Sequence, residues 1–273
     1  MERRPPWCAA PWPPSEGAVS LLLLGEGACA VAGAVAGVAI MGAADHYTFD
    51  QSLLPLPTCP LCGRFSRPLA YVPILGPLLT VKCGFCRGTG SWWLAIVVQA
   101  AMAVIWAMLA GRYGGGWPLA SSLVLTGLLV AIAVIDFQHR LIPSLLVYPT
   151  ILIALAGSPL WPGLGFLKSL EGGALGFALF FALALLARLV FGDGALGGGD
   201  VTLAAAIGAI CGYPLVVLSL ALGAFLGGFG ALVVMVVRRS PIGTAIPYGP
   251  YLIGGVVYVL LSGNTVHPIY SIL

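Results

Sequence analysis

Long apolar runs separated by short polar or glycine-rich turns make up most of this chain. The first run covers roughly 17–42, and the longest polar segment of the chain follows it. Seven more apolar runs come after that segment, at about 92–110, 118–135, 141–157, 171–191, 201–212, 214–237 and 248–261. A helix needs about 20 apolar residues to cross the hydrocarbon core, and the run at 201–212 is short for a full crossing. The pattern therefore predicts an all-α polytopic membrane protein with seven to eight transmembrane helices.

The composition excludes a soluble protein. Of the 273 residues, 60% are hydrophobic and 8% are charged, whereas about a quarter of the residues in a soluble domain are charged. Membrane lipid is therefore the expected surrounding of the helices. The net charge is only +3, and the Lys and Arg residues are scattered over the loops without forming a phosphate-binding stripe. We expect no nucleic-acid partner.

The pattern divides the chain into four parts. Residues 1–16 are rich in Pro and Trp and are expected to form an irregular N-terminus. Residues 17–42 form the first transmembrane helix, and 43–91 form a polar loop domain. Residues 92–273 contain the remaining apolar runs and form the helical membrane core.

Four of the seven cysteines lie in the polar loop as two C-x-x-C pairs, Cys59 with Cys62 and Cys83 with Cys86. This spacing fits a tetrahedral Cys₄ zinc site, which has no open position and is therefore structural. Such a site would fold a segment too small and too Pro-rich for a core of its own. Four free thiols or two disulfides are the alternatives, but disulfides are rare in the cytoplasm.

The distribution of positive charge predicts the orientation of the chain. With eight crossings, eight of the twelve Lys and Arg residues fall on the side of the cysteine loop and four on the other side. Because the cytoplasmic side carries the excess of positive charge, the loop is expected in the cytoplasm and the N-terminus outside. The same count brings Asp136 and Asp200 to the cytoplasmic ends of their helices.

These two aspartates are the candidate catalytic residues. Asp136 ends one apolar run, and Gly197-Gly198-Gly199-Asp200 opens another. Two carboxyl groups in one site do not ionise together easily, so they share a proton. The ionised one can activate a water, while the protonated one polarises a peptide carbonyl and later protonates the leaving amine. The glycines leave room for a substrate backbone. This chemistry predicts an aspartic endopeptidase.

Other interpretations of the two acids remain open at this stage. Each aspartate can be a solvated helix end, and His139 can either tune Asp136 or simply contact water. A proton-coupled transporter would use the carboxylates as a relay, but it would place charges nearer the bilayer centre and show inverted repeats. Neither is evident in the sequence. A non-catalytic assembly protein that keeps the fold is the third alternative.

Four motifs follow one another over most of the chain. They are Cys59-Pro60-Leu61-Cys62 with Cys83-Gly84-Phe85-Cys86, Asp136 with Leu141-Ile142-Pro143, Gly197-Gly198-Gly199-Asp200, and Ile246-Pro247-Tyr248-Gly249-Pro250-Tyr251. Each is weak alone, but all four in this order are specific. In these motifs the chain resembles the type IV prepilin peptidases, which are GxGD-type aspartic membrane peptidases.

The resemblance implies an enzyme of the bacterial inner membrane that cuts the short leader from prepilins or pseudopilins. The cut would fall on the cytoplasmic side, before the substrate's hydrophobic helix, with Asp136 and Asp200 as the catalytic pair. Many members also methylate the new N-terminus with S-adenosylmethionine. This chain has Thr202 where the family often has Lys and Ser144 where it often has Asp. S-adenosylmethionine is therefore expected as a cofactor only if the methyltransferase activity is retained.

Overall fold

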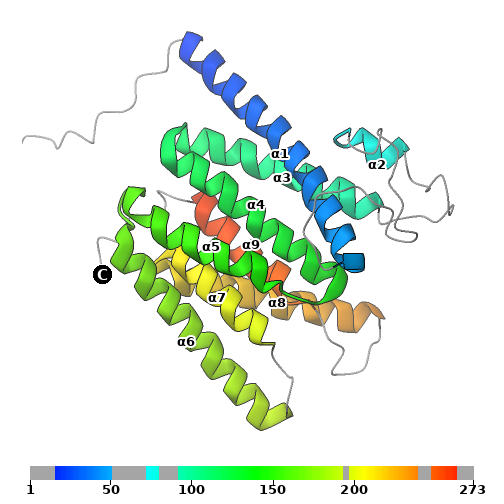
Figure 1. Cartoon of the computed structure of the whole chain (residues 1–273), viewed down its shortest axis with the longest axis vertical. Helices are drawn as coiled ribbons and strands as arrows, with labels where there is room; N and C mark the ends of the chain where they lie inside the picture. Colours follow the sequence, from blue (N-terminus) through cyan, green and yellow to red (C-terminus); the bar gives the residue numbers. More distant parts are fainter. Residues whose placement is uncertain (1–15, 51–71, 80–91, 193–196, 239–246, 263–273) are drawn as a thin grey trace, which may run out of the picture.

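The structure is a computed structural model that describes residues 16–50, 72–79, 92–192, 197–238 and 247–262. The described residues are almost entirely helical (Figure 1). The helices are α1 (Glu16–Asp50), α2 (Leu75–Leu79), α3 (Trp92–Tyr113), α4 (Gly116–His139), α5 (Ser144–Gly157), the 3₁₀ turn η3 (Ser158–Leu160), α6 (Gly165–Phe191), α7 (Gly198–Cys211), α8 (Leu215–Arg238) and α9 (Gly249–Ser262). The predicted all-α class is confirmed for these residues.

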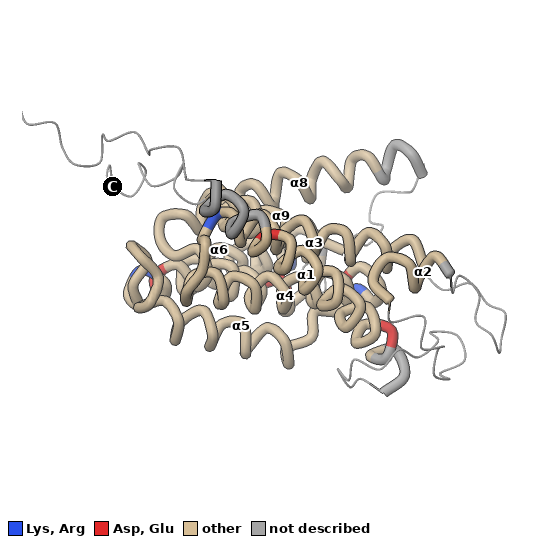
Figure 2. The backbone as a smooth tube through the Cα atoms, turned by 90° about the horizontal axis from the view of Figure 1, so that it is seen from above, with Lys and Arg blue, Asp and Glu red and all other residues tan. Residues whose placement is uncertain are grey.

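Five described helices are long and apolar enough to cross a membrane, and they lie in α1, α3, α4, α6 and α8. Figure 2 shows long uncharged stretches along the helices, with few charged residues among them. Three shorter apolar helices, at Ser144–Leu160, Gly198–Cys211 and Gly249–Ser262, account for the remaining apolar runs. The chain is a multi-pass membrane protein, and seven to eight full crossings remain a prediction because of these three short helices.

The first helix is longer than the sequence pattern predicts, because α1 continues past Gly42 to Asp50. The extension is held by packing: Met41 and Ala44 are buried in a cluster with Val98 of α3 and Ile135 of α4. The start of the predicted polar loop is thus helical, because it continues a helix that packs against α3 and α4. The irregular N-terminus predicted for 1–16 lies almost wholly outside the described residues, as do the four cysteines of the predicted zinc site.

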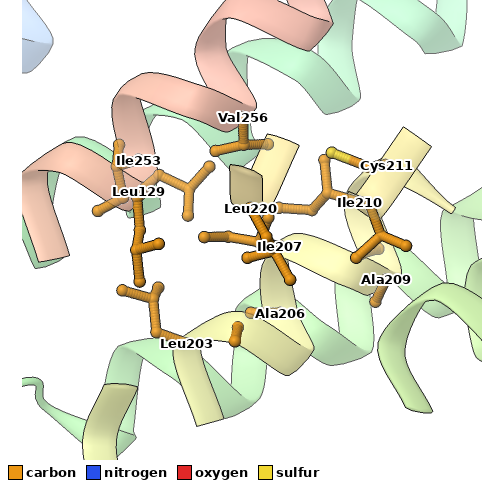
Figure 3. Packing of buried hydrophobic residues seen from close by; sticks show 14 of the residues in the cluster. Leu129, Leu203, Ala206, Ile207, Ala209, Ile210, Cys211, Leu220, Ile253 and Val256 are labelled. Carbon is orange, nitrogen blue, oxygen red and sulfur yellow. The ribbon is translucent and has the colours of Figure 1, made fainter. Parts of the chain in front are cut away.

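The short helix α7 lies at the centre of the larger hydrophobic core. Its side chains are buried on nearly every side, as expected for a helix that is apolar all round. Leu203 and Ile207 lie with Leu129 of α4 and Val256 of α9 in one cluster (Figure 3). The position of α7 therefore depends on its neighbours and not on lipid.

Helix α6 packs against α7 through glycines that bring the two backbones into direct contact. A Cβ at Gly172 would lie 2.3 Å from the Gly208 carbonyl oxygen, and one at Gly176 would lie 2.3 Å from the Ala204 carbonyl oxygen. Small residues at such spacing allow membrane helices to approach closely. The opposite side of α6 carries exposed large side chains, such as Leu189, which is 77% exposed. Helix α6 thus fixes one side of α7 and presents its other side to lipid.

Candidate active site

Asp136 lies in the last turn of α4 and is only 5% exposed. Its backbone carbonyl accepts a hydrogen bond from the Arg140 N–H at 2.7 Å, and Arg140 has a left-handed backbone conformation with φ 55°. This turn ends α4 and leads through Ile142 and Pro143 to the start of α5 at Ser144. The helix therefore ends just beyond the carboxylate.

The Asp136 side chain is fixed by a residue far away in the sequence. Its Oδ2 accepts a hydrogen bond from the backbone N–H of Gly249, at the start of α9, at 2.9 Å. A Cβ on Gly249 would lie 2.7 Å from the same oxygen, which is closer than real Cβ atoms come. Only glycine fits between α9 and this carboxylate, so the contact sets both the orientation of Asp136 and the identity of residue 249.

Asp200 lies in the first turn of α7, where the positive end of a helix suits an acid. Its backbone N–H donates to the Gly197 carbonyl at 3.1 Å, and the Gly197 backbone also hydrogen-bonds its carboxyl group. The neighbouring Gly199 rests on the turn after Asp136, since a Cβ there would lie 2.8 Å from the Cβ of Ile142.

The structure therefore brings the two predicted aspartates to the same end of the helical bundle. Asp136 and Asp200 are close enough for their charges to interact. The contact between Gly199 and Ile142 accounts for this placement, because each of these residues lies close in sequence to one of the two acids. Asp136 is buried and Asp200 is partly exposed, so the pair is reachable mainly from the side of Asp200.

A third polar group lies at this end and was assigned no role from the sequence. Tyr248 immediately precedes Gly249, and its ring lies 6.5 Å, centroid to centroid, from that of Phe180 of α6. Burial, and then the charge of Asp200, raise the pKa of the Tyr248 phenol. The sequence signal was the motif around Tyr248, which carried the family resemblance but no chemistry.

The end of α1 meets the end of α4 on another side of Asp136. The Gln138 side-chain amide donates to the Asp45 carboxylate at 3.3 Å. The Nε2 of His139 lies 3.3 Å from the Ala44 carbonyl oxygen, and its ring centroid is 6.2 Å from that of Tyr47. These contacts place His139 against α1. Sequence reasoning missed Asp45, which had been assigned to the polar loop.

The two positions that depart from the family pattern both lie in the first turns of helices. The Thr202 hydroxyl donates to the Gly199 carbonyl at 2.9 Å, within the first turn of α7. Ser144 is the first residue of α5.

The zinc site stays a prediction, because Cys59, Cys62, Cys83 and Cys86 lie outside the described residues. Within the part of the chain that the structure describes, no group of three or more His, Cys, Asp or Glu side chains is arranged to hold a metal.

Fold and site together define a polytopic helical membrane protein with two interacting carboxyl groups at one end. The sequence model of the type IV leader peptidase family matches residues 123–232, which include both aspartates. The chain belongs to the type IV leader peptidase family, and it is a peptidase.

Several relatives support this assignment, and each is described as a prepilin leader peptidase/N-methyltransferase. The one from Pseudomonas aeruginosa is 30% identical over 219 residues, which are 80% of this chain and 75% of the relative. The one from Pseudomonas putida is 31% identical over 218 residues, 79% of this chain and 75% of the relative. The one from Bacillus subtilis is 29% identical over 227 residues, 80% of this chain and 86% of the relative. No solved structure matches the chain.

Proposed function

We propose that this peptidase removes the leader peptide of type IV prepilins or pseudopilins, with Asp136 and Asp200 as the two catalytic groups. The observation that carries the proposal is the placement of these two carboxyl groups at the same end of the bundle, where Gly199 packs against Ile142. The family membership supports the substrate class, because the matching relatives are described as prepilin leader peptidases.

The proposed reaction is hydrolysis without a covalent intermediate. One carboxylate takes a proton from a water molecule as the water oxygen bonds to the peptide carbonyl carbon. The other carboxyl group gives its proton to the carbonyl oxygen, which produces a tetrahedral diol. When the C–N bond breaks, the nitrogen takes the proton that the first carboxyl group removed from water and leaves as an amine. One diol hydroxyl returns its proton to the second carboxylate, and the carbon side becomes a carboxylic acid. Because the Gly249 N–H holds Asp136 Oδ2, that carboxyl group is oriented before the substrate arrives.

The proposed location of the cleavage is the cytoplasmic face of the bacterial inner membrane. The excess of Lys and Arg on the side of the cysteine loop supports this orientation. The substrate's leader would lie outside the lipid on this face, and the hydrophobic helix that follows the cut would stay in the membrane. An extended backbone between them would fit the glycine-rich start of α7.

We propose a structural zinc ion bound by Cys59, Cys62, Cys83 and Cys86, supported by the spacing of the two C-x-x-C pairs. A closed Cys₄ site would order the loop and supply no step of the hydrolysis. Metal analysis of the purified protein and of a Cys59→Ser variant tests it: an unchanged zinc content in the variant refutes the site.

The proposal is confined to the peptidase activity, although the names of the relatives include an N-methyltransferase. Support for this restriction comes from Thr202, which stands where the family often has Lys and bonds its own helix turn. Mass spectrometry of the processed substrate decides the matter, because a methylated N-terminal amine would mean that S-adenosylmethionine is used as well.

Co-expression with a prepilin tests the peptidase proposal directly. Leader removal, followed by the shift in substrate mass, should be lost in both Asp136→Asn and Asp200→Asn. These changes keep the size of the side chain and remove its ability to ionise. Glu171→Gln in α6 is the matched control, because this exposed acid lies on another part of the bundle and should leave processing intact. If processing survives both aspartate changes, the proposed function is wrong.

A further inference from the structure

The backbone of Tyr248 is fixed relative to Asp136. Its carbonyl accepts hydrogen bonds from the N–H groups of Tyr251 at 3.2 Å and Leu252 at 3.3 Å, which begin α9. The next residue, Gly249, donates to Asp136 Oδ2. The first turn of α9 therefore places the Tyr248 backbone next to Asp136, and the position of its ring depends on the side chain alone.

The ring of Tyr248 is held between α6 and α8. On one side it contacts the ring of the buried Phe180, with an interplanar angle of 44°. On the other side it lies against Gly227, where a Cβ would come within 2.5 Å of the ring atom Cε2. The absence of a side chain at Gly227 makes room for the ring, so the ring has a defined place and not a free surface position.

The phenol group of Tyr248 is near enough to Asp200 for the charge of that carboxylate to act on it. A tyrosine phenol is protonated in the neutral range at its ordinary pKa, and here burial, and then the charge of Asp200, raise that pKa further. Among the residues that the structure describes, the Tyr248 phenol has no hydrogen-bond partner. The group is half-buried, so a substrate can reach it.

We propose that Tyr248 is a third catalytic residue, whose O–H donates a hydrogen bond to the carbonyl oxygen of the scissile peptide as that carbon becomes tetrahedral. This inference rests on the proposed peptidase function. The phenol keeps its proton throughout and forms no covalent bond. A preformed donor aimed at developing negative charge lowers the barrier without reorganising during the reaction. The alternative is that the ring only fills the space between α6 and α8.

The Tyr248→Phe variant separates these two roles, because it removes the hydroxyl and keeps the ring between Phe180 and Gly227. The measurement is the rate of leader removal by the full-length protein in detergent, with kcat and KM determined separately. We expect kcat to fall about 100-fold, the loss typical of removing one oxyanion donor, and KM to stay within about twofold, since the bond forms only in the transition state.

Tyr258→Phe in α9 is the matched control. Tyr258 is 56% exposed on the same helix, and its phenol also makes no described hydrogen bond, so the change should leave kcat unaltered. The thermal unfolding of each variant is recorded as well, and rates are compared at a temperature where all proteins are folded. The optimum pH of Tyr248→Phe should match that of the wild type, because a phenol with a raised pKa does not titrate in that range.

The outcomes distinguish a failure of this inference from a failure of the proposed function. If the wild type cleaves prepilin and Tyr248→Phe has the same kcat, the phenol has no catalytic role and the peptidase proposal stands. If KM rises while kcat is unchanged, the phenol acts in ground-state binding and the inference is wrong. If the wild type releases no leader from prepilin, the proposed function and this inference fail together.

Discussion

Asp136 and Asp200 are held in their places by opposite means. Asp136 ends a long helix, is buried, and is oriented by a backbone N–H from a residue 113 positions away. Asp200 begins a short helix, is partly exposed, and takes its hydrogen bond from the neighbouring Gly197. The orientation of Asp136 thus depends on where α9 lies, while the location of Asp200 depends on how α7 packs. The site therefore depends on two tertiary contacts that can be broken separately.

The largest expected effect comes from the two carboxyl groups themselves. Asp136→Asn and Asp200→Asn should each lower kcat/KM by about 10³-fold or more, because each removes a proton-transfer group. The double variant should be no worse than either single one, since groups that act as a unit are strongly non-additive. Single-turnover kinetics with a prepilin peptide measure this. Losses that multiply in the double variant would mean that the two acids act independently.

A methyl group at residue 249 should disturb the orientation of the Asp136 carboxyl group. Gly249→Ala places a Cβ within 2.7 Å of Asp136 Oδ2 and pushes the carboxyl group aside. A displacement of about 1 Å can cost about 100-fold in rate, so we expect a loss of that order.

Gly254→Ala on the same helix is the control, because its Cβ would meet Leu226 at an ordinary 3.5 Å. The rate of leader removal by both variants is compared with that of the wild type. Equal rates for the two variants would show that the close contact at Gly249 does not set the orientation of Asp136.

The position of Asp200 should be disturbed by a change in how α7 packs against α6. In Gly208→Ala a Cβ would lie 2.1 Å from the Gly172 carbonyl oxygen, so α6 and α7 must move apart. Overpacking of this kind costs about 1–3 kcal/mol, and thermal unfolding in detergent should show the loss.

Gly228→Ala is the matched control, because no atom lies within 4 Å of its added Cβ. If Gly208→Ala unfolds at the same temperature as this control, the two helices do not depend on their glycine contact. Activity should fall in parallel with stability, unlike in Gly249→Ala, where activity falls first.

The smallest effect is expected at the join between α1 and α4. Asp45→Ala removes the acceptor of the Gln138 amide, a contact worth about 1 kcal/mol. We expect a slightly lower unfolding temperature and a rate within about threefold of the wild type, since neither aspartate of the dyad touches this contact directly. A loss as large as that in Gly249→Ala would place Asp45 in the catalytic machinery.

Much of this organisation follows from the sequence, because its apolar runs and its costly intramembrane acids are local signals. Each predicted run corresponds to a helix, and the sequence alone marks Asp136 and Asp200 as the candidate pair. The extension of α1 past Gly42 was missed, because a polar stretch becomes helical only through burial of Ala44 against α3 and α4. The placement of Tyr248 beside Asp200 was missed for the same reason, since three separate helices define it.

The helices that carry the site are short. Helices α5, α7 and α9 have 14 residues each, which corresponds to about 21 Å, against about 30 Å of hydrocarbon. All three begin at the site: α5 just after Ile142, α7 just before Asp200, and α9 at the residue that binds Asp136. Three neighbouring helices, each shorter than the hydrocarbon is thick, therefore begin at the two carboxyl groups. A hydrolase consumes water, and we expect water to enter at this end, where Asp200 is partly exposed.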